Sequence, residues 1–186
     1  LGYVSRLYKQ SICVSGTHGK TTTTSMVTEI LLAADADPTI SVGGILNSIG
    51  GNIRLGGSEL FVTEACEYTN SFLSFFPNRE VILNIEADHL DFFKDIDDIR
   101  HSFRLFAQKL PKDGLLVINS DIDRYEEIVD GLECRIVTCG KRTDSNYRAE
   151  DITYDHFARA AFRLMIDGQD AGEITLGVPG EHNVYN

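Results

Sequence analysis

The most specific chemical signal in the sequence is a turn at residues 16–21, which contains glycine and lysine and reads Gly-Thr-His-Gly-Lys-Thr. Backbone N–H groups in such a turn, with the N-terminus of a following helix, can surround a phosphate. A lysine there neutralises the β and γ phosphates, and a threonine hydroxyl ligates the accompanying Mg²⁺. The candidate nucleotide-binding residues are Gly16, Thr17, His18, Gly19, Lys20, Thr21 and Thr22.

The spacing of this turn is shorter than that of the general phosphate-binding motif, which has four residues between its first glycine and the Gly-Lys pair. Here two residues, Thr17 and His18, separate them. An ordinary glycine turn before a threonine-rich helix is the alternative interpretation. The strand predicted before the turn and the helix predicted after it favour phosphate binding.

Two carboxylates and a histidine follow other apolar stretches. Glu64 ends one of them, Glu67 comes three residues later, and His89 lies in the segment 84–91, Asn-Ile-Glu-Ala-Asp-His-Leu-Asp. The carboxyl ends of parallel strands meet at one edge of a sheet, where open α/β folds bind ligands. Either glutamate could hold a metal or position a water, and His89 could ligate a metal while a carboxylate orients its other ring nitrogen. A solvated acidic turn and a structural histidine are the alternatives.

Two further segments have weaker signals. Six of the 16 glycines lie in residues 43–57, which favours either close backbone approach to a ligand or a mobile hairpin. The segment 180–186, Gly-Glu-His-Asn-Val-Tyr-Asn, has amide side chains that can present a donor and an acceptor to a base edge. A surface loop is its alternative interpretation.

The elements that must position these residues alternate along the chain. Short β-branched stretches at 11–15, 39–42, 60–63, 81–85, 115–119 and 135–138 predict buried parallel strands. Apolar residues at helical spacing predict a helix after Lys20, with Met26, Val27, Ile30 and Leu31 on its buried stripe, and another from Ile96 to Leu110. We therefore expect an α/β fold of the P-loop type, a mostly parallel sheet with helices on both faces.

The C-terminal part has a different pattern. Stretches at 151–154, 160–166 and 173–176 alternate more strongly, and Asp167-Gly168 is typical of a turn between antiparallel strands. We expect a small antiparallel β appendage there.

Composition restricts the possible partners. Seventeen Lys and Arg residues against 28 Asp and Glu residues give a net charge of −11 over 186 residues, which disfavours nucleic acid and anionic membranes. No apolar run approaches the roughly 18 residues of a membrane span, so we expect a cytoplasmic protein without membrane or nucleic-acid partners. The four cysteines lack metal-site spacing and predict buried, reduced thiols.

The segments 16–23, 64–67, 84–91 and 179–186 together resemble the Mur ligase family, in order and in approximate spacing. The resemblance implies that ATP phosphorylates a substrate carboxylate and that the amino group of an amino acid attacks the acyl phosphate. It is strongest for the branch that joins L-alanine to UDP-N-acetylmuramate in peptidoglycan precursor synthesis. The nearest rival is the branch that attaches a recycled peptide to the same sugar nucleotide.

The resemblance also implies roles for individual residues. Lys20 would bind the β and γ phosphates, Thr21 and Glu64 would hold one Mg²⁺, and His89 a second. His182, Asn183 and Asn186 would match adenine-side residues, and Glu67 is a candidate for a supporting role. Some branches carry a carbamylated lysine on the helix after the Asp-His pair, where this sequence has Arg100 and Arg104.

Family members have three domains, and the resemblance places residues 1–186 in the central, ATP-binding one. We therefore expect N-terminal sugar-nucleotide and C-terminal domains outside this chain and no ligation by the chain alone. A P-loop kinase and a non-catalytic nucleotide-binding module are the alternatives from other classes. Stable phosphate transfer to a hydroxyl substrate would favour the kinase.

Overall fold

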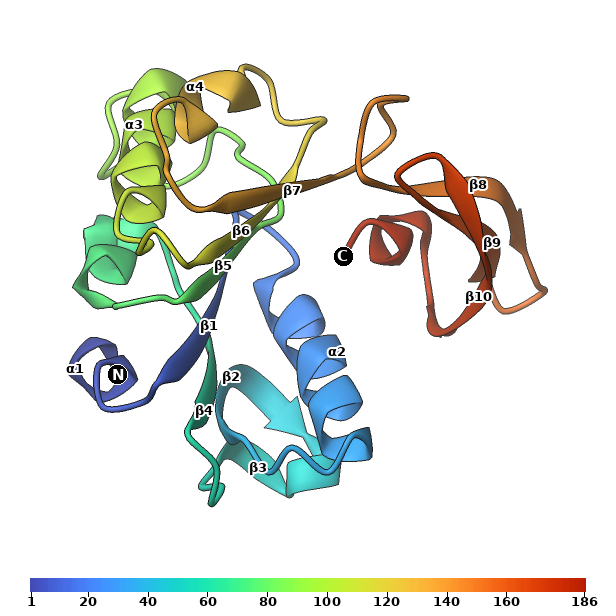
Figure 1. Cartoon of the computed structure of the whole chain (residues 1–186), viewed down its shortest axis with the longest axis horizontal. Coiled ribbons are helices and arrows are strands. Elements are labelled where there is room, and N and C mark those ends of the chain that lie inside the picture. Colours follow the sequence, from blue (N-terminus) through green and yellow to red (C-terminus); the bar gives the residue numbers. More distant parts are fainter.

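The structure is a computed structural model that describes residues 1–186, and its strands join in one sheet of ten (Figure 1). The strand order is β10-β9-β8-β7-β6-β5-β1-β4-β2-β3. The strands are β1 (Gln10–Ser15), β2 (Thr39–Leu46), β3 (Gly51–Arg54), β4 (Leu60–Glu64), β5 (Arg79–Ile82), β6 (Leu115–Asn119), β7 (Arg135–Cys139), β8 (Tyr147–Tyr154), β9 (Arg159–Ile166) and β10 (Gln169–Pro179).

Four α-helices and three short 3₁₀ segments connect the strands. They are α1 (Gly2–Ser5), α2 (Lys20–Ala33), α3 (Ile96–Ala107) and α4 (Tyr125–Val129), with η1 (Asn47–Ile49), η2 (Tyr68–Ser74) and η3 (Glu181–Val184). α2 lies on one face of the sheet, and α3 and α4 lie on the other (Figure 1). The predicted mostly parallel α/β sheet with helices on both faces is confirmed. None of these helices combines the length and the apolar character needed to cross a membrane.

The strand β1 lies between β4 and β5 and is parallel to both. Val14 pairs with Glu64 of β4, and Ser15 pairs with Ile82 of β5, so the three strands end at the same edge. After β1 the chain continues through α2 to β2, on one side of β1, and it later reaches β5 on the other side. The edge where β1 ends is therefore a switch point in strand order. In open α/β sheets ligands bind at such points.

The main core lies between the sheet and α3. Phe103 and Phe106 of α3 are fully buried against Phe72, and Ile82 and Leu116 enter the same cluster from the sheet. The helix begins at an N-cap, Asp95, whose side chain accepts a hydrogen bond from the Asp98 backbone N–H at 3.0 Å. The predicted helix starting at Ile96 is confirmed, although it ends at Ala107 rather than at Leu110.

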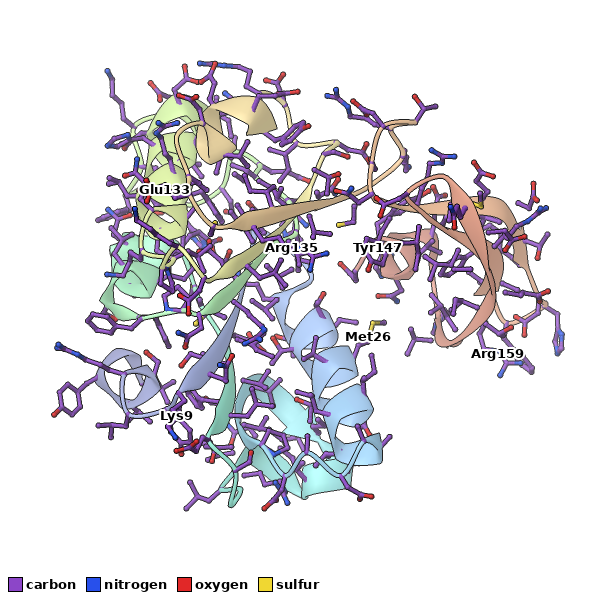
Figure 2. All side chains as sticks on the ribbon, viewed as in Figure 1. Lys9, Met26, Glu133, Arg135, Tyr147 and Arg159 are labelled. Carbon is purple, nitrogen blue, oxygen red and sulfur yellow. The ribbon has the colours of Figure 1, made fainter.

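The predicted apolar stripe of α2 is not its fully buried face, since Met26, Val27 and Leu31 are only half-buried. The helix packs against β1, β2 and β4 with Thr23, Thr24 and Thr28, whereas Ile30 is 68% exposed. Thr24 and Thr28 lie at steps of four from Lys20, whose ammonium is hydrogen-bonded to Glu67 at the strand ends, so they share its face of the helix. Figure 2 shows the side chain of Met26 pointing away from the sheet.

The C-terminal strands form the expected antiparallel appendage. β8 pairs with β9 and β9 with β10, both antiparallel, and Asp167 and Gly168 form the turn between β9 and β10 with φ of 49° and 77°. Positive φ at both positions matches the twist of a two-residue hairpin. After β10 the chain returns toward the N-terminus of α2 (Figure 1).

The cysteine prediction is correct in part. All four cysteines are free and Cys13 is buried, but Cys66 is exposed and Cys134 and Cys139 are half-buried. Cys66 lies in the turn between β4 and η2, outside the sheet, and this position explains its exposure. Burial raises the pKa of Cys13 and raises that of Cys139 to about 11.

Candidate functional site

The phosphate-loop candidate connects the end of β1 to the first turn of α2. Gly16 and Gly19 have φ of 140° and 84°, conformations that residues with a Cβ rarely adopt. A Cβ on Gly16 would lie 3.0 Å from the Cβ of Leu83. Gly19 is the N-cap of α2, so the free N–H groups of the helix begin directly after the loop. A surface depression of about 270 Å³ lies over residues 17–22.

Asn84 holds the loop in place from the neighbouring strand end. Its side-chain Oδ1 accepts from the His18 backbone N–H at 2.7 Å, and its Nδ2 donates to the His18 carbonyl at 3.0 Å. Its own carbonyl accepts from the Thr17 N–H at 3.1 Å, and Glu86 N donates to Thr17 Oγ1 at 2.9 Å. No role for Asn84 follows from the sequence, because residue 84 falls inside the predicted strand 81–85, whereas β5 ends at Ile82. An amide side chain within an apolar stretch is the local signal.

The Lys20 ammonium lies inside the loop. Its Nζ donates to the carbonyls of Gly16 at 2.6 Å and Thr17 at 3.2 Å, and to Glu67 Oε2 at 2.9 Å. The Lys20 side chain is 16% exposed and that of Glu67 is 2% exposed. Charged hydrogen bonds in such surroundings are stronger than in water. Lys20 is therefore held at the spot where the helix N-terminus also attracts anions.

Thr21 and Glu64 come together from α2 and β4. Thr21 Oγ1 donates to Glu64 Oε2 at 3.1 Å, and Glu64 Oε1 accepts from the Gly43 backbone N–H at 2.5 Å. A Cβ on Gly43 would lie 2.7 Å from Glu64 Oε2, so a larger residue there would push this carboxylate aside. The glycine-rich segment thus forms part of a hairpin, β2–η1–β3, whose Gly43 touches the site.

Oxygen donors of this kind suit Mg²⁺. The hydroxyl of Thr21 and the carboxylate of Glu64 are hard ligands on adjacent elements. No cluster of three or more His, Cys, Asp and Glu side chains in the structure could hold a metal ion by itself. The pair therefore fits an ion that also takes phosphate oxygens and waters, which is how Mg²⁺ usually binds with nucleotides.

His89 lies on the other side of Glu67. Its Nε2 is 3.9 Å from Glu67 Oε1 and 3.9 Å from Asp88 Oδ2, and its ring packs on that of Tyr68 with centroids 4.6 Å apart. The backbone of His89 has φ of 52°, an uncommon conformation for a residue with a Cβ. Tyr68 donates to Asp91 at 2.9 Å, and this hydrogen bond raises the pKa of the phenol.

One of the three predicted base-recognition residues, Asn186, lies against the loop. Asn183 is buried; its Nδ2 donates to the Pro179 carbonyl at 2.7 Å, and its Oδ1 accepts from Asn186 at 2.9 Å. Asn186 lies against Gly19, where an added Cβ would be 2.4 Å from its Oδ1. The side chain of His182 is exposed and contacts none of the other predicted residues. The structure thus brings Asn186 to the loop, while Asn183 and the His182 carbonyl, which accepts from the Asn186 N–H at 3.1 Å, hold Asn186 in place.

A larger cavity is lined in part by Asn186. It has a volume of about 460 Å³ and a mainly apolar lining from β6–β9 and from residues 184–186. It contains none of Lys20, Glu64 or His89. The charged groups, rather than the volume, therefore identify the candidate site at the ends of β1, β4 and β5.

The chain is similar to a family of known enzymes. A family model described as Mur ligase middle domain matches residues 14–186. The UDP-N-acetylmuramate–L-alanine ligase of Lachnospira eligens is 63% identical over all of this chain, which covers 41% of that protein. The chain thus spans about two fifths of the length of the curated relatives it matches.

Solved structures share the fold. The UDP-N-acetylmuramate–alanine ligase of Thermotoga maritima matches with a TM-score of 0.83 and 30% identity, over 98% of this chain and 40% of that one. The UDP-N-acetylmuramate:L-alanyl-γ-D-glutamyl-meso-diaminopimelate ligase of Neisseria meningitides matches with a TM-score of 0.85 and 27% identity, over 99% and 61%.

Proposed function

The chain belongs to the Mur ligase middle domain family, and from this premise we propose that it is the ATP-binding domain of a ligase that joins L-alanine to UDP-N-acetylmuramate. One observation carries the proposal. The ends of β1, β4 and β5 bring Lys20, the Thr21–Glu64 pair and the Glu67–His89 pair to one edge of the sheet. The 63% identity to the Lachnospira eligens enzyme supports the choice of substrate.

The reaction has two steps in this proposal. A carboxylate oxygen of the sugar nucleotide attacks the γ phosphorus of ATP, and ADP leaves. The amine nitrogen of L-alanine then attacks the acyl carbon, loses a proton, and displaces inorganic phosphate to leave an amide. Such chemistry depends on positioning and on neutralising the charge of the phosphates.

Each residue contributes a specific part. The loop N–H groups and Lys20 bind the β and γ phosphates, and Thr21 with Glu64 would hold one Mg²⁺. His89 would hold a second through one ring nitrogen. When bound, the ions would draw negative charge from the phosphate oxygens. Asn183 fixes Asn186 beside the loop, where its amide can face the nucleoside.

The rest of the ligase lies outside this chain in the proposal. Because the chain spans about 40% of its relatives' length, we infer that other domains bind the sugar nucleotide and the amino acid. The chain alone would then bind nucleotide without ligating. We place the enzyme in the cytoplasm, where ATP is available.

Calorimetry with a non-hydrolysable ATP analogue and Mg²⁺ tests the proposal. We expect the full-length protein to bind the analogue. The affinity should fall by about a hundredfold in Lys20→Ala, because the substitution removes the charge that pairs with the phosphates. The exposed Lys9→Ala, whose lysine pairs with Glu59 far from the loop, is the control. Binding that survives in Lys20→Ala would refute the phosphate site.

A second candidate function is the attachment of a preformed peptide to the same sugar nucleotide. The TM-score of 0.85 to the Neisseria meningitides enzyme is the observation that favours this second function. ADP formation by the full-length protein with L-alanine, but not with an L-alanyl tripeptide, supports the first function. The reverse preference supports the second.

A further inference from the structure

The carboxylate of Glu67 lies between Lys20 and His89 and is almost completely enclosed. Its Oε2 and Oε1 are 2.9 and 3.3 Å from Lys20 Nζ, and its Oε1 is also 3.9 Å from His89 Nε2. The contacts with Lys20 are hydrogen bonds, whereas the distance to His89 exceeds the usual upper limit for one by about 0.7 Å. Glu67 therefore holds Lys20 firmly in this nucleotide-free arrangement and has His89 within reach.

An incoming nucleotide must compete with these contacts. The three protons of the Lys20 ammonium have acceptors in the Gly16 carbonyl, the Thr17 carbonyl and Glu67. Phosphate oxygens can bind the ammonium only by displacing an acceptor. The two carbonyls belong to the loop that also carries the phosphate-binding N–H groups, so Glu67 is the acceptor that can be given up without opening the loop.

The backbone of Glu67 is fixed, so its carboxylate cannot move with the Lys20 ammonium when that group turns to the phosphates. Glu67 is the N-cap of η2, and its carbonyl accepts from the Asn70 N–H at 2.8 Å. A buried carboxylate without a partner is costly, so its side chain must find another cationic or N–H group. His89 Nε2 is that group, because a small movement shortens 3.9 Å to hydrogen-bond distance. Asp88 is equally near His89 but is 46% exposed, which weakens its hold on the ring.

We propose that Glu67 is a positioning residue that holds Lys20 before the nucleotide binds and His89 after it has bound. Tyr68, the next residue, packs on the His89 ring with centroids 4.6 Å apart. A carboxylate on one ring nitrogen orients a histidine so that the other nitrogen can ligate a metal. The inference rests on the proposed function, since it takes the loop as a nucleotide site.

The test is Glu67→Gln in the full-length protein, with three measurements. The substitution removes the negative charge that attracts Lys20 and lies near the phosphates, and leaves only a neutral amide oxygen as a competing acceptor. Calorimetry should therefore show ADP binding without Mg²⁺ that is about tenfold tighter. The kcat should fall at least tenfold, because the amide holds His89 poorly. The KM for ATP should not rise. Glu67→Asp, which keeps the charge, should recover part of the kcat.

Glu29→Gln, on the exposed surface of α2, is the matched control for loss of one carboxylate, and thermal unfolding verifies that each variant folds. A purely structural role would weaken ADP binding together with kcat and would overturn the proposal. Weaker binding of Mg²⁺-ADP with unchanged binding of metal-free ADP would make Glu67 a metal ligand, and would also overturn it. If Glu67→Gln does not fold, Glu67→Asp replaces it: its shorter side chain should lower kcat without weakening the binding of metal-free ADP, and a parallel loss of both overturns the proposal. A wild-type protein that binds no ADP would instead refute the proposed function.

Discussion

Asn186 lies directly over Gly19, so that a Cβ at position 19 would be 2.4 Å from the Asn186 Oδ1. The two residues come from opposite ends of the chain, and Asn183 holds the Asn186 side chain at 2.9 Å. This contact links the phosphate loop to the C-terminal segment. Gly19 has φ of 84° and thus needs glycine for its backbone as well as for this contact.

Gly19→Ala should weaken ATP-analogue binding by roughly tenfold or more, because the methyl group displaces Asn186 and strains the loop. Gly168→Ala is the matched control, since Gly168 has φ of 77° and no atom near its Cβ position. Both variants should lose about 1–2 kcal/mol of unfolding free energy, but only the first should lose affinity. Equal affinities in calorimetry would contradict the importance of the contact.

Asn84→Ala should loosen the loop. It removes two hydrogen bonds to the His18 backbone and leaves both backbone groups without their partner. We expect a loss of about 1–3 kcal/mol in unfolding free energy, together with roughly tenfold weaker nucleotide binding. Asn146→Ala, which removes hydrogen bonds to Thr138 and Asp167 far from the loop, should lose stability alone. Denaturant titration and calorimetry on both variants separate the two effects.

Glu64→Gln should raise the Mg²⁺ concentration needed for half-maximal activity of the full-length enzyme. The amide retains the shape of the side chain but loses the charge that attracts the cation, so an increase of about tenfold is expected. Glu59→Gln, whose exposed carboxylate pairs with Lys9, should leave the requirement unchanged. An unaltered Mg²⁺ dependence in Glu64→Gln would show that this carboxylate does not hold the ion.

Glu80 should make the protein less stable as the pH rises. Its carboxyl is fully buried without a hydrogen-bond partner, and burial raises its pKa well above the ordinary value of 4.5. The folded state thus keeps the proton that the unfolded state loses. The associated stability is fully present below pH 4.5 and is lost by about 1.4 kcal/mol for each pH unit until the folded-state pKa is reached.

Denaturant titrations at pH 5 and pH 7 check this dependence. Glu80→Gln should lack it, and the exposed Glu29→Gln should retain it, which separates the effect from the titration of the other carboxylates. A wild-type protein whose stability changes with pH in the same way as that of Glu80→Gln would contradict the assignment.

The sequence by itself determined the α/β fold and predicted the candidate phosphate loop with several of the residues around it. Alternating β-branched and helical stretches predict the parallel strands and α3, because local propensity and apolar spacing act within one element. The loop from Gly16 to Thr21 is likewise local, since glycine conformations and the helix N-terminus are properties of consecutive residues. Glu64 and His89 were predicted because each follows a strand.

The tertiary structure alone decided which groups meet. The hydrogen bonds from Asn84 to the loop and the Lys20–Glu67 pair depend on strand order and register. Neither strand order nor register can be read from a single segment of the sequence. The buried threonines of α2 face the sheet, against the apolar pattern of the helix itself. Asn186 reaches Gly19 because the antiparallel strands turn the chain back. Contacts between distant segments arise from the packing of whole elements, and this is why spacing along the chain could not reveal them.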